Sequence, residues 1–283
     1  MSECTPITFA KDNHVPDMTL SASREPTTTL NSLKNEYESR PVRWPDAGQN
    51  VTVTGISPIT RIAEYFSIPS SYLGGSIAVQ LKLFETETST VDLLDMEPMS
   101  TSQLLPLGQF RAGVHGYNET LDLESPPALT SWLDRVIQYQ RFELDLITTA
   151  QDGLDFDDLR LRTLHIGERI TLEKNFNYGH SIRFLTPPEL VKTVSGSYFP
   201  SRSQRDSRAL RIDLTHATDV DRDTIARMER RLKGAPFIFS AHPGQNGWHF
   251  DDYTFMARLF TELDYTSNYS GSNSITSMTL VEA

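Results

Sequence analysis

The sequence predicts a mostly β protein in which a β-sandwich or barrel precedes a smaller α+β domain. Short segments with alternating apolar and polar residues recur through residues 41–187, and turn residues separate them. Residues 188–283 instead place one amphipathic helix among short strands, which is an α+β order. Apolar residues make up 38% of the 283-residue chain, which is enough to form a hydrophobic core.

The first 40 residues differ in composition from the rest of the chain. Ser, Thr and Pro are frequent there, and apolar residues such as Ile7, Val15 and Leu20 stand alone. Such a segment buries too little apolar area to offset its loss of conformational entropy. Residues 1–40 are therefore predicted to form an N-terminal arm, which is either disordered or extended and ordered against a neighbouring subunit.

Three strand patterns open the predicted sandwich domain, residues 41–187. Residues 51–55 alternate apolar and polar side chains, and residues 59–68 repeat β-branched and aromatic ones. Residues 76–84 are the clearest strand, because the apolar residues at 77, 79, 81 and 83 share one face. Residues 85–107 are polar and irregular, and they are predicted to form a long loop, with or without one short helix.

Four further strand patterns complete the predicted sandwich domain. They lie at residues 136–139, 142–147, 159–166 and 169–172. Their short spacing favours a sandwich or barrel over alternating strands and helices. Pro187 and Pro188 mark the predicted boundary with the second domain.

One helix is predicted in the second domain, at about residues 221–233. Asp221 is a good N-cap residue, and Val220 and Ile225 have the spacing of a hydrophobic staple. Ile225, Met228 and Leu232 form one apolar stripe. Gly234 suits the left-handed position just after a helix, and Pro236 prevents its continuation. Strands are predicted at residues 210–214, 237–240, 255–263 and 275–281.

The charge and cysteine content exclude several functional classes. The formal net charge of −11 repels phosphate backbones, so we expect no nucleic-acid partner. Cys4 is the single cysteine, so neither an internal disulfide nor a cysteine-based zinc site can form. No apolar run approaches the roughly 20 residues that span a bilayer, so we expect no membrane insertion.

The sequence contains no recognisable catalytic motif, and we predict no enzyme, no catalytic residue, no cofactor and no metal site. None of the seven histidines has the spacing that places two rings on one metal ion. His242 and His249 could meet across a loop near Asp251, but a polar loop without a metal is the simpler interpretation. The acidic run of residues 152–158 lacks the calcium-loop spacing, so we interpret it as an exposed turn.

The loop that begins at Gly244 is the most suggestive candidate for binding a partner. It carries Trp248, His249 and Phe250, with Tyr253 shortly after. Aromatic faces beside hydrogen-bonding groups can bind sugars or a protein partner. The competing interpretation is that these aromatic side chains cap the core of the domain.

Several short motifs follow one another along the chain in an order that matches a known class of protein. It comprises Phe142-Glu-Leu-Asp-Leu, the Asp152-Gly turn, His165-Ile-Gly, Asn175-Phe-Asn-Tyr-Gly, and Pro236-Phe-Ile-Phe leading to His242-Pro. In this order the motifs resemble tail structural proteins of long-tailed bacteriophages. The resemblance implies a jelly-roll-like β-sandwich and a tail-tip or baseplate component related to distal tail proteins that form rings. It implies no catalytic residues.

These expectations lead to one main functional hypothesis and two alternatives. The main hypothesis is a structural component of a phage tail tip, made in the host cytoplasm and carried in the virion. Its partners would be other tail or baseplate proteins and copies of itself in a closed ring. The first alternative is a virion module that recognises a receptor by binding cell-surface glycan. The second is a hydrolase of surface polysaccharide, and fold alone does not decide among the three.

Overall fold

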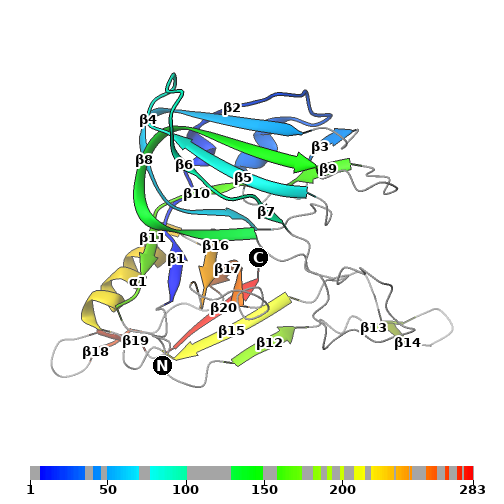
Figure 1. Cartoon of the computed structure of the whole chain (residues 1–283). Helices are drawn as coiled ribbons and strands as arrows, with labels where there is room; N and C mark the ends of the chain where they lie inside the picture. Colours follow the sequence, from blue (N-terminus) through cyan, green and yellow to red (C-terminus); the bar gives the residue numbers. More distant parts are fainter. Residues whose placement is uncertain are drawn as a thin grey trace, which may run out of the picture. The chain divides into compact units, whose positions relative to one another are not determined.

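In the computed structural model the chain is mostly β, with two antiparallel seven-stranded sheets and one α-helix among the described residues (Figure 1). The structure describes residues 7–35, 41–45, 50–69, 77–100, 129–148, 158–173, 181–185, 190–192, 198–200, 207–213, 218–232, 234–241, 243, 253–259, 265–267, 273–275 and 277–282. The chain forms two compact units, one of residues 10–169 and one that combines residues 1–9 with residues 170–283. The predicted boundaries at residues 40 and 187 differ from this division.

The unit of residues 10–169 is built on one large sheet with the strand order β10-β4-β8-β5-β6, in which β2 also pairs with β4 and β7 with β5. The strands of this sheet are β2 (Thr19–Ala22), β4 (Val51–Ile68), β5 (Ile77–Phe84), β6 (Asp92–Asp95), β7 (Met99–Ser100), β8 (Leu129–Thr148) and β10 (His165–Gly167). Beside the sheet lie a two-stranded ladder, β3 (Val42–Pro45) with β9 (Asp158–Leu161), and two 3-10 helices, η1 (Val15–Asp17) and η2 (Leu30–Lys34).

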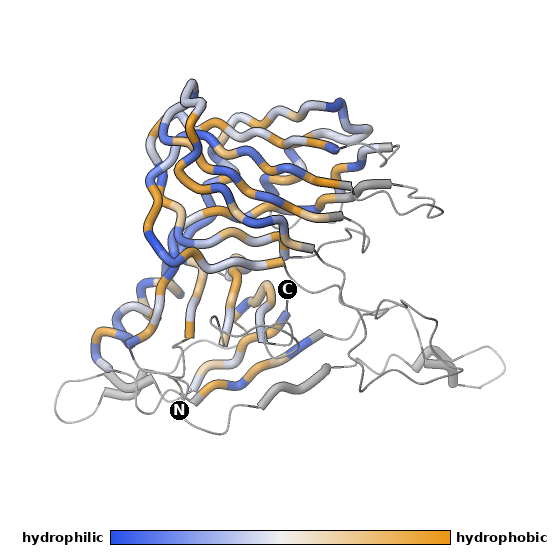
Figure 2. Tube along the Cα trace, in the orientation of Figure 1, coloured by the Kyte–Doolittle hydropathy of each residue, from blue (hydrophilic) through white to orange (hydrophobic). Residues whose placement is uncertain are grey.

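The large sheet folds over its own core to make a β-sandwich, as the sequence predicts. Strands β4 and β8 are 18 and 20 residues long, and both ends of each contribute to one hydrophobic cluster. Val53 and Phe66 represent the two ends of β4, and Ile137 and Leu144 those of β8. Figure 1 shows both strands arching, and Figure 2 shows the alternation of hydrophobic and hydrophilic residues along them.

Gly55 shows how tightly the sandwich core is packed. It lies directly opposite Phe142 in the β4–β8 ladder, and the aromatic ring covers its Cα. A Cβ atom at this position would lie 2.1 Å from Phe142 Cε1, which is far inside van der Waals contact. The glycine is therefore required for Phe142 to fill the core.

The other unit is built on a sheet with the strand order β11-β1-β16-β17-β20-β15-β12. Its strands are β1 (Thr8–Ala10), β11 (Arg169–Thr171), β12 (Ser181–Leu185), β15 (Ser207–Asp213), β16 (Phe237–Ser240), β17 (Thr254–Leu259) and β20 (Ser277–Glu282). Two small ladders, β13 (Leu190–Lys192) with β14 (Tyr198–Pro200) and β18 (Tyr265–Ser267) with β19 (Asn273–Ile275), complete the strands. The helix α1 spans Asp219–Leu232.

The described part of the N-terminal segment is ordered on its own chain, which differs from the predicted arm. Ile7 and Phe9 are fully buried, and β1 pairs with β16 so that Phe9 lies opposite Phe239. The ring of Phe9 lies 5.4 Å from that of Phe239 and 6.0 Å from that of Phe237. The sequence pattern hides this role, because a three-residue strand is too short to show a period.

The helix confirms its predicted apolar stripe and its predicted end, but it begins two residues earlier than predicted. Thr218 is the N-cap residue: its Oγ1 accepts a hydrogen bond from Asp221 N at 3.2 Å, and Asp221 Oδ2 accepts one from Thr218 N at 3.3 Å. Asp221 is thus the third helical residue of a reciprocal capping pair and not the N-cap. Val220 is 57% exposed, so the predicted staple with Ile225 is wrong. Gly234 has φ +83°, as its predicted position requires.

Candidate ligand-binding pocket

Of the four residues predicted to contact a partner, the structure describes only Tyr253. Trp248, His249 and Phe250 lie outside the described residues, as do His242 and Asp251. Tyr253 is half-buried and packs against the core of the unit that contains α1. Its carbonyl oxygen accepts a hydrogen bond from Ala241 N at 3.1 Å. For Tyr253 the structure therefore supports packing, and partner binding by the rest of this loop stays a prediction.

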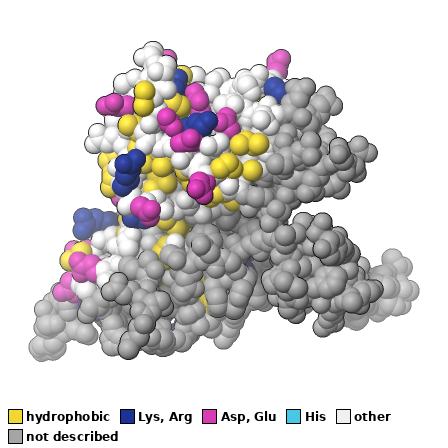
Figure 3. All heavy atoms as spheres, viewed as in Figure 1, with side chains coloured by type: hydrophobic (Ala, Val, Ile, Leu, Met, Phe, Trp, Pro, Cys, Tyr) yellow, Lys and Arg dark blue, Asp and Glu magenta, His cyan; other side chains and the backbone are white. Residues whose placement is uncertain are grey.

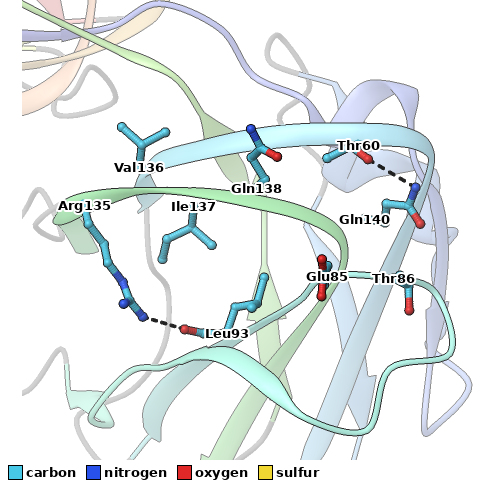
Figure 4. A pocket seen from close by; sticks show the side chains of 9 residues that line it. All are labelled: Thr60, Glu85, Thr86, Leu93, Arg135, Val136, Ile137, Gln138 and Gln140. Carbon is cyan, nitrogen blue, oxygen red and sulfur yellow. Dashed lines mark hydrogen bonds between the residues drawn. The ribbon is translucent and has the colours of Figure 1, made fainter.

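A pocket of about 460 Å³ opens on the sandwich unit instead (Figure 4). Among the described residues, the bend of β4, the stretch from the end of β5 into β6, and the middle of β8 line it. The lining residues are Thr60, Glu85, Thr86, Leu93, Arg135, Val136, Ile137, Gln138 and Gln140.

The pocket exists because β4 and β8 leave their common register at two nearby places. Residues 57–60 of β4 lie opposite Gln140 alone, and residues 133–136 of β8 lie opposite Glu64 alone. Extra residues of this kind bend a strand and re-aim its side chains. The first irregularity supplies Thr60 to the pocket, and the second supplies Arg135 and Val136.

Side chains of β8 fix the other segments of the pocket. Arg135 Nη2 donates to Leu93 O at 2.7 Å, and Gln140 Nε2 donates to Thr60 Oγ1 at 3.3 Å (Figure 4). Just outside the lining, Arg141 donates to Glu87 O at 3.1 Å and to Ser89 O at 2.6 Å. The β5–β6 connection is therefore tied to β8 at two backbone carbonyl groups, and β6 is tied to it at a third.

The lining combines an apolar end with a polar end. Leu93 and Ile137 lie at one end beside Arg135, with Val136 on the other side of the β8 ribbon, and Thr60, Thr86 and Gln140 lie toward the other end (Figure 4). The described residues of the lining include one carboxylate, that of Glu85, and one guanidinium group, that of Arg135, so their formal charges cancel.

Several lining groups are available to a ligand. The side chains of Glu85, Thr86 and Gln138 are on exposed residues and make no hydrogen bond among the residues that the structure describes. Together they offer amide and hydroxyl donors as well as carboxylate, amide and hydroxyl acceptors.

Three exposed large hydrophobic residues either line the pocket or belong to segments that line it. Val136 lines it and is 60% exposed, Ile59 adjoins Thr60 and is 54% exposed, and Val91 belongs to the β5–β6 connection and is 71% exposed. The space-filling view shows hydrophobic side chains beside charged ones of both signs on the described part of the sandwich unit (Figure 3). A patch of mixed character next to a pocket is typical of a binding surface.

Two buried histidines of the sandwich unit lie outside the pocket lining. Burial lowers the pKa of His165, which is 1% exposed, to about 4. Burial and then the nearby charge of Arg61 lower the pKa of His14.

Across the described ranges no three His, Cys, Asp or Glu side chains cluster in a way that could hold a metal ion. None of the helices in those ranges is long and apolar enough to cross a membrane.

The pocket was not predicted from the sequence. The alternation of Ile137, Gln138, Tyr139 and Gln140 does place both glutamines away from the core, and that signal was available. Sequence patterns did not show which segments meet these glutamines, because the irregular pairing of β4 with β8 is a tertiary feature.

No protein-family model matches the chain, and no curated protein matches it in sequence. Among solved structures, it is similar to the family 32 carbohydrate-binding module from Streptococcus pneumoniae EndoD, at 13% identity and a TM-score of 0.37, over 56% of this chain and 99% of that one. A Clostridium perfringens module in complex with GalNAc-β-1,3-galactose gives 8% identity and a TM-score of 0.37, over 56% and 100%. XRCC1 bound to a DNA polymerase β catalytic domain gives 11% and 0.34, over 52% and 91%. TM-scores this low carry no functional argument.

Proposed function

We propose that this chain is a non-catalytic binding protein and that the pocket beside β8 takes an uncharged, polyhydroxylated ligand, namely a saccharide. The observation that carries the proposal is the set of side chains in the lining. Glu85, Thr86 and Gln138 present unused donors and acceptors next to an apolar wall. A sugar ring has the same two features, since its hydroxyl groups form hydrogen bonds and its C–H faces are apolar.

The size and charge of the pocket agree with this ligand class. A volume of about 460 Å³ falls in the usual range for small-molecule sites, roughly 300–1,000 Å³. Glu85 and Arg135 cancel in charge, so the lining has no net attraction for an anion or a cation. The apolar end formed by Leu93 and Ile137 suits the methyl group of an N-acetyl substituent. N-acetylglucosamine and N-acetylgalactosamine are therefore the first probes to use.

The lining supports binding without hydrolysis. Most glycoside hydrolases place two carboxyl groups on either side of the scissile bond. Among the described residues of the lining, Glu85 supplies the single carboxylate. We therefore assign Glu85 the role of a hydrogen-bond acceptor for ligand hydroxyl groups.

The predicted role in a phage tail tip stays a prediction, and so do the ring assembly and the virion location. Glycan binding at this pocket is compatible with the alternative of a receptor-recognition module. Saccharide binding at this pocket does not depend on the particle in which the chain works.

A saccharide array followed by calorimetry tests the proposal. The wild-type chain is expected to bind at least one neutral saccharide, and Gln138→Ala to weaken that binding by about tenfold or more, since the variant removes the amide donor and acceptor that we assign to the ligand. Gln80→Ala is the matched control, because Gln80 lies on β5 and bonds to Asp95 at 2.6 Å outside the lining. Absence of binding by the wild type, or equal affinity of wild type and Gln138→Ala, would refute the proposal.

A further inference from the structure

One wall of the pocket, residues 85–91 between β5 and β6, has few contacts of its own. Residues 85–88 are exposed, and two of them, Glu85 and Thr86, line the pocket. The described hydrogen bonds within the segment are Ser89 N to Thr86 O at 3.4 Å and Ser89 Oγ to Val91 O at 3.0 Å. Two bonds of this kind do not hold a seven-residue connection in one conformation against its entropy.

Arg141 supplies the missing restraint from the neighbouring strand. Its two Nη atoms donate to the carbonyl oxygens of Glu87 and Ser89, at 3.1 and 2.6 Å. Its guanidinium carbon lies 4.0 Å from the centre of the Phe84 ring, at the start of the segment. Its Nη2 also lies 3.5 Å from Glu143 Oε1, and the side chain is only 18% exposed. Arg141 therefore holds the segment at its start and at two points along it.

The guanidinium group is specifically suited to this task. Two carbonyl oxygens, of Glu87 and Ser89, converge on it, and its planar fork offers separate donors to both while its face covers an aromatic ring. The strand irregularity explains its location. Arg141 follows Gln140, the single residue opposite the bulged residues 57–60, so β8 reaches both flanking segments from two consecutive positions.

We propose that Arg141 is a positioning residue, which fixes residues 85–91 as a wall of the pocket and so places Glu85 and Thr86 for the ligand without lining the pocket itself. The effect on ligand affinity rests on the proposed function, whereas the placement of the segment does not. Replacement by lysine keeps the positive charge but loses the fork that reaches two carbonyl groups. The segment is then expected to move freely while the sandwich core stays intact.

Hydrogen exchange on the free protein decides this inference without any ligand. In Arg141→Lys, the amide of Ser89 is expected to exchange about tenfold faster than in the wild type, with unchanged exchange for β4 core amides such as that of Phe66. Arg222→Lys is the matched control, because the Arg222 side chain has a similar exposure of 16% but pairs with the Asp219 carboxylate, at 3.1 Å, in the other unit. It should leave Ser89 unchanged.

Calorimetry with N-acetylglucosamine and N-acetylgalactosamine adds the functional readout. Weaker binding by Arg141→Lys together with faster exchange at Ser89 supports the positioning role. Unchanged exchange at Ser89 overturns it, and weaker binding in that case would mean that Arg141 contacts the sugar directly. Faster exchange with no saccharide bound by the wild type would support the positioning role and refute the proposed function.

Discussion

Truncation of Phe9 to alanine is a direct test of the N-terminal strand as part of the fold. Phe9 is fully buried in β1, between β11 and β16, and its ring packs on those of Phe237 and Phe239 at 6.0 and 5.4 Å. Loss of a buried phenylalanine side chain costs about 3–5 kcal/mol through transfer and cavity terms. Two aromatic contacts vanish with it, and this favours the upper part of that range.

A loss of about 4 kcal/mol is a large share of the 5–15 kcal/mol that stabilises a typical domain. We expect the midpoint of urea unfolding of Phe9→Ala to fall clearly below that of the wild type. Amides of β16 should lose hydrogen-exchange protection first, because β16 pairs with β1. Phe9→Leu is the control, and it should recover most of the loss because it refills much of the volume. A decrease below about 1 kcal/mol for Phe9→Ala would refute the reasoning, since truncation of a truly buried ring costs more.

Three further predictions concern the core and its charges. Gly55→Ala should destabilise the chain by about 1–3 kcal/mol in urea unfolding, because the new Cβ would overlap the Phe142 ring; an unchanged midpoint would contradict the packing. His165 has a folded-state pKa of about 4, below its ordinary value of about 6.5, so its contribution to stability should be constant above pH 6.5 and fall by up to about 3 kcal/mol as the pH decreases to about 4. The substitution His165→Gln should flatten that acid limb, and an equally steep limb would argue against burial of the imidazole. Arg208→Met should destabilise by about 3 kcal/mol or more in the same assay, because Arg208 is 7% exposed and pairs with Glu282 at 2.8 Å; a loss below 1 kcal/mol would contradict a buried pair.

Local periodicity correctly predicted the strand and the helix that each bury one face. The strand predicted at residues 76–84 is β5, and Val79, Leu81 and Leu83 are fully buried as their alternation requires. The stripe of Ile225 and Met228 faces the core in the same way. In both cases a single period fixes which side chains lie inside, so the sequence suffices.

Features that depend on contacts across the chain were not predictable in this way. Two strand patterns at residues 51–55 and 59–68 are one strand, β4, because the chain bulges at 57–60 without leaving the sheet. The two pieces predicted within residues 132–147 likewise form one strand, β8. Such bulges interrupt the alternation, so a sequence pattern shows two strands where hydrogen bonding makes one.

In the candidate site, too, local periodicity predicts the directions of side chains but not the contacts between distant segments. The outward direction of Gln138 and Gln140 follows from alternation along β8, but the meeting of β8 with residues 85–93 follows from two arginines that bind backbone carbonyl groups. Carbonyl groups are present at every residue, so no sequence signal marks the ones that an arginine selects. Aromatic composition drew attention to Trp248 and Phe250 instead, which lie outside the described residues.

The most direct test of the saccharide site observes the side-chain amide groups of Gln138 and Gln140 by nuclear magnetic resonance while N-acetylglucosamine or N-acetylgalactosamine is added. Saccharide binding in the pocket predicts saturable shifts of both amide resonances with one common dissociation constant, while the amide of Gln80 outside the lining stays in place. Shifts confined to other parts of the chain, or none at saturating sugar, would contradict it.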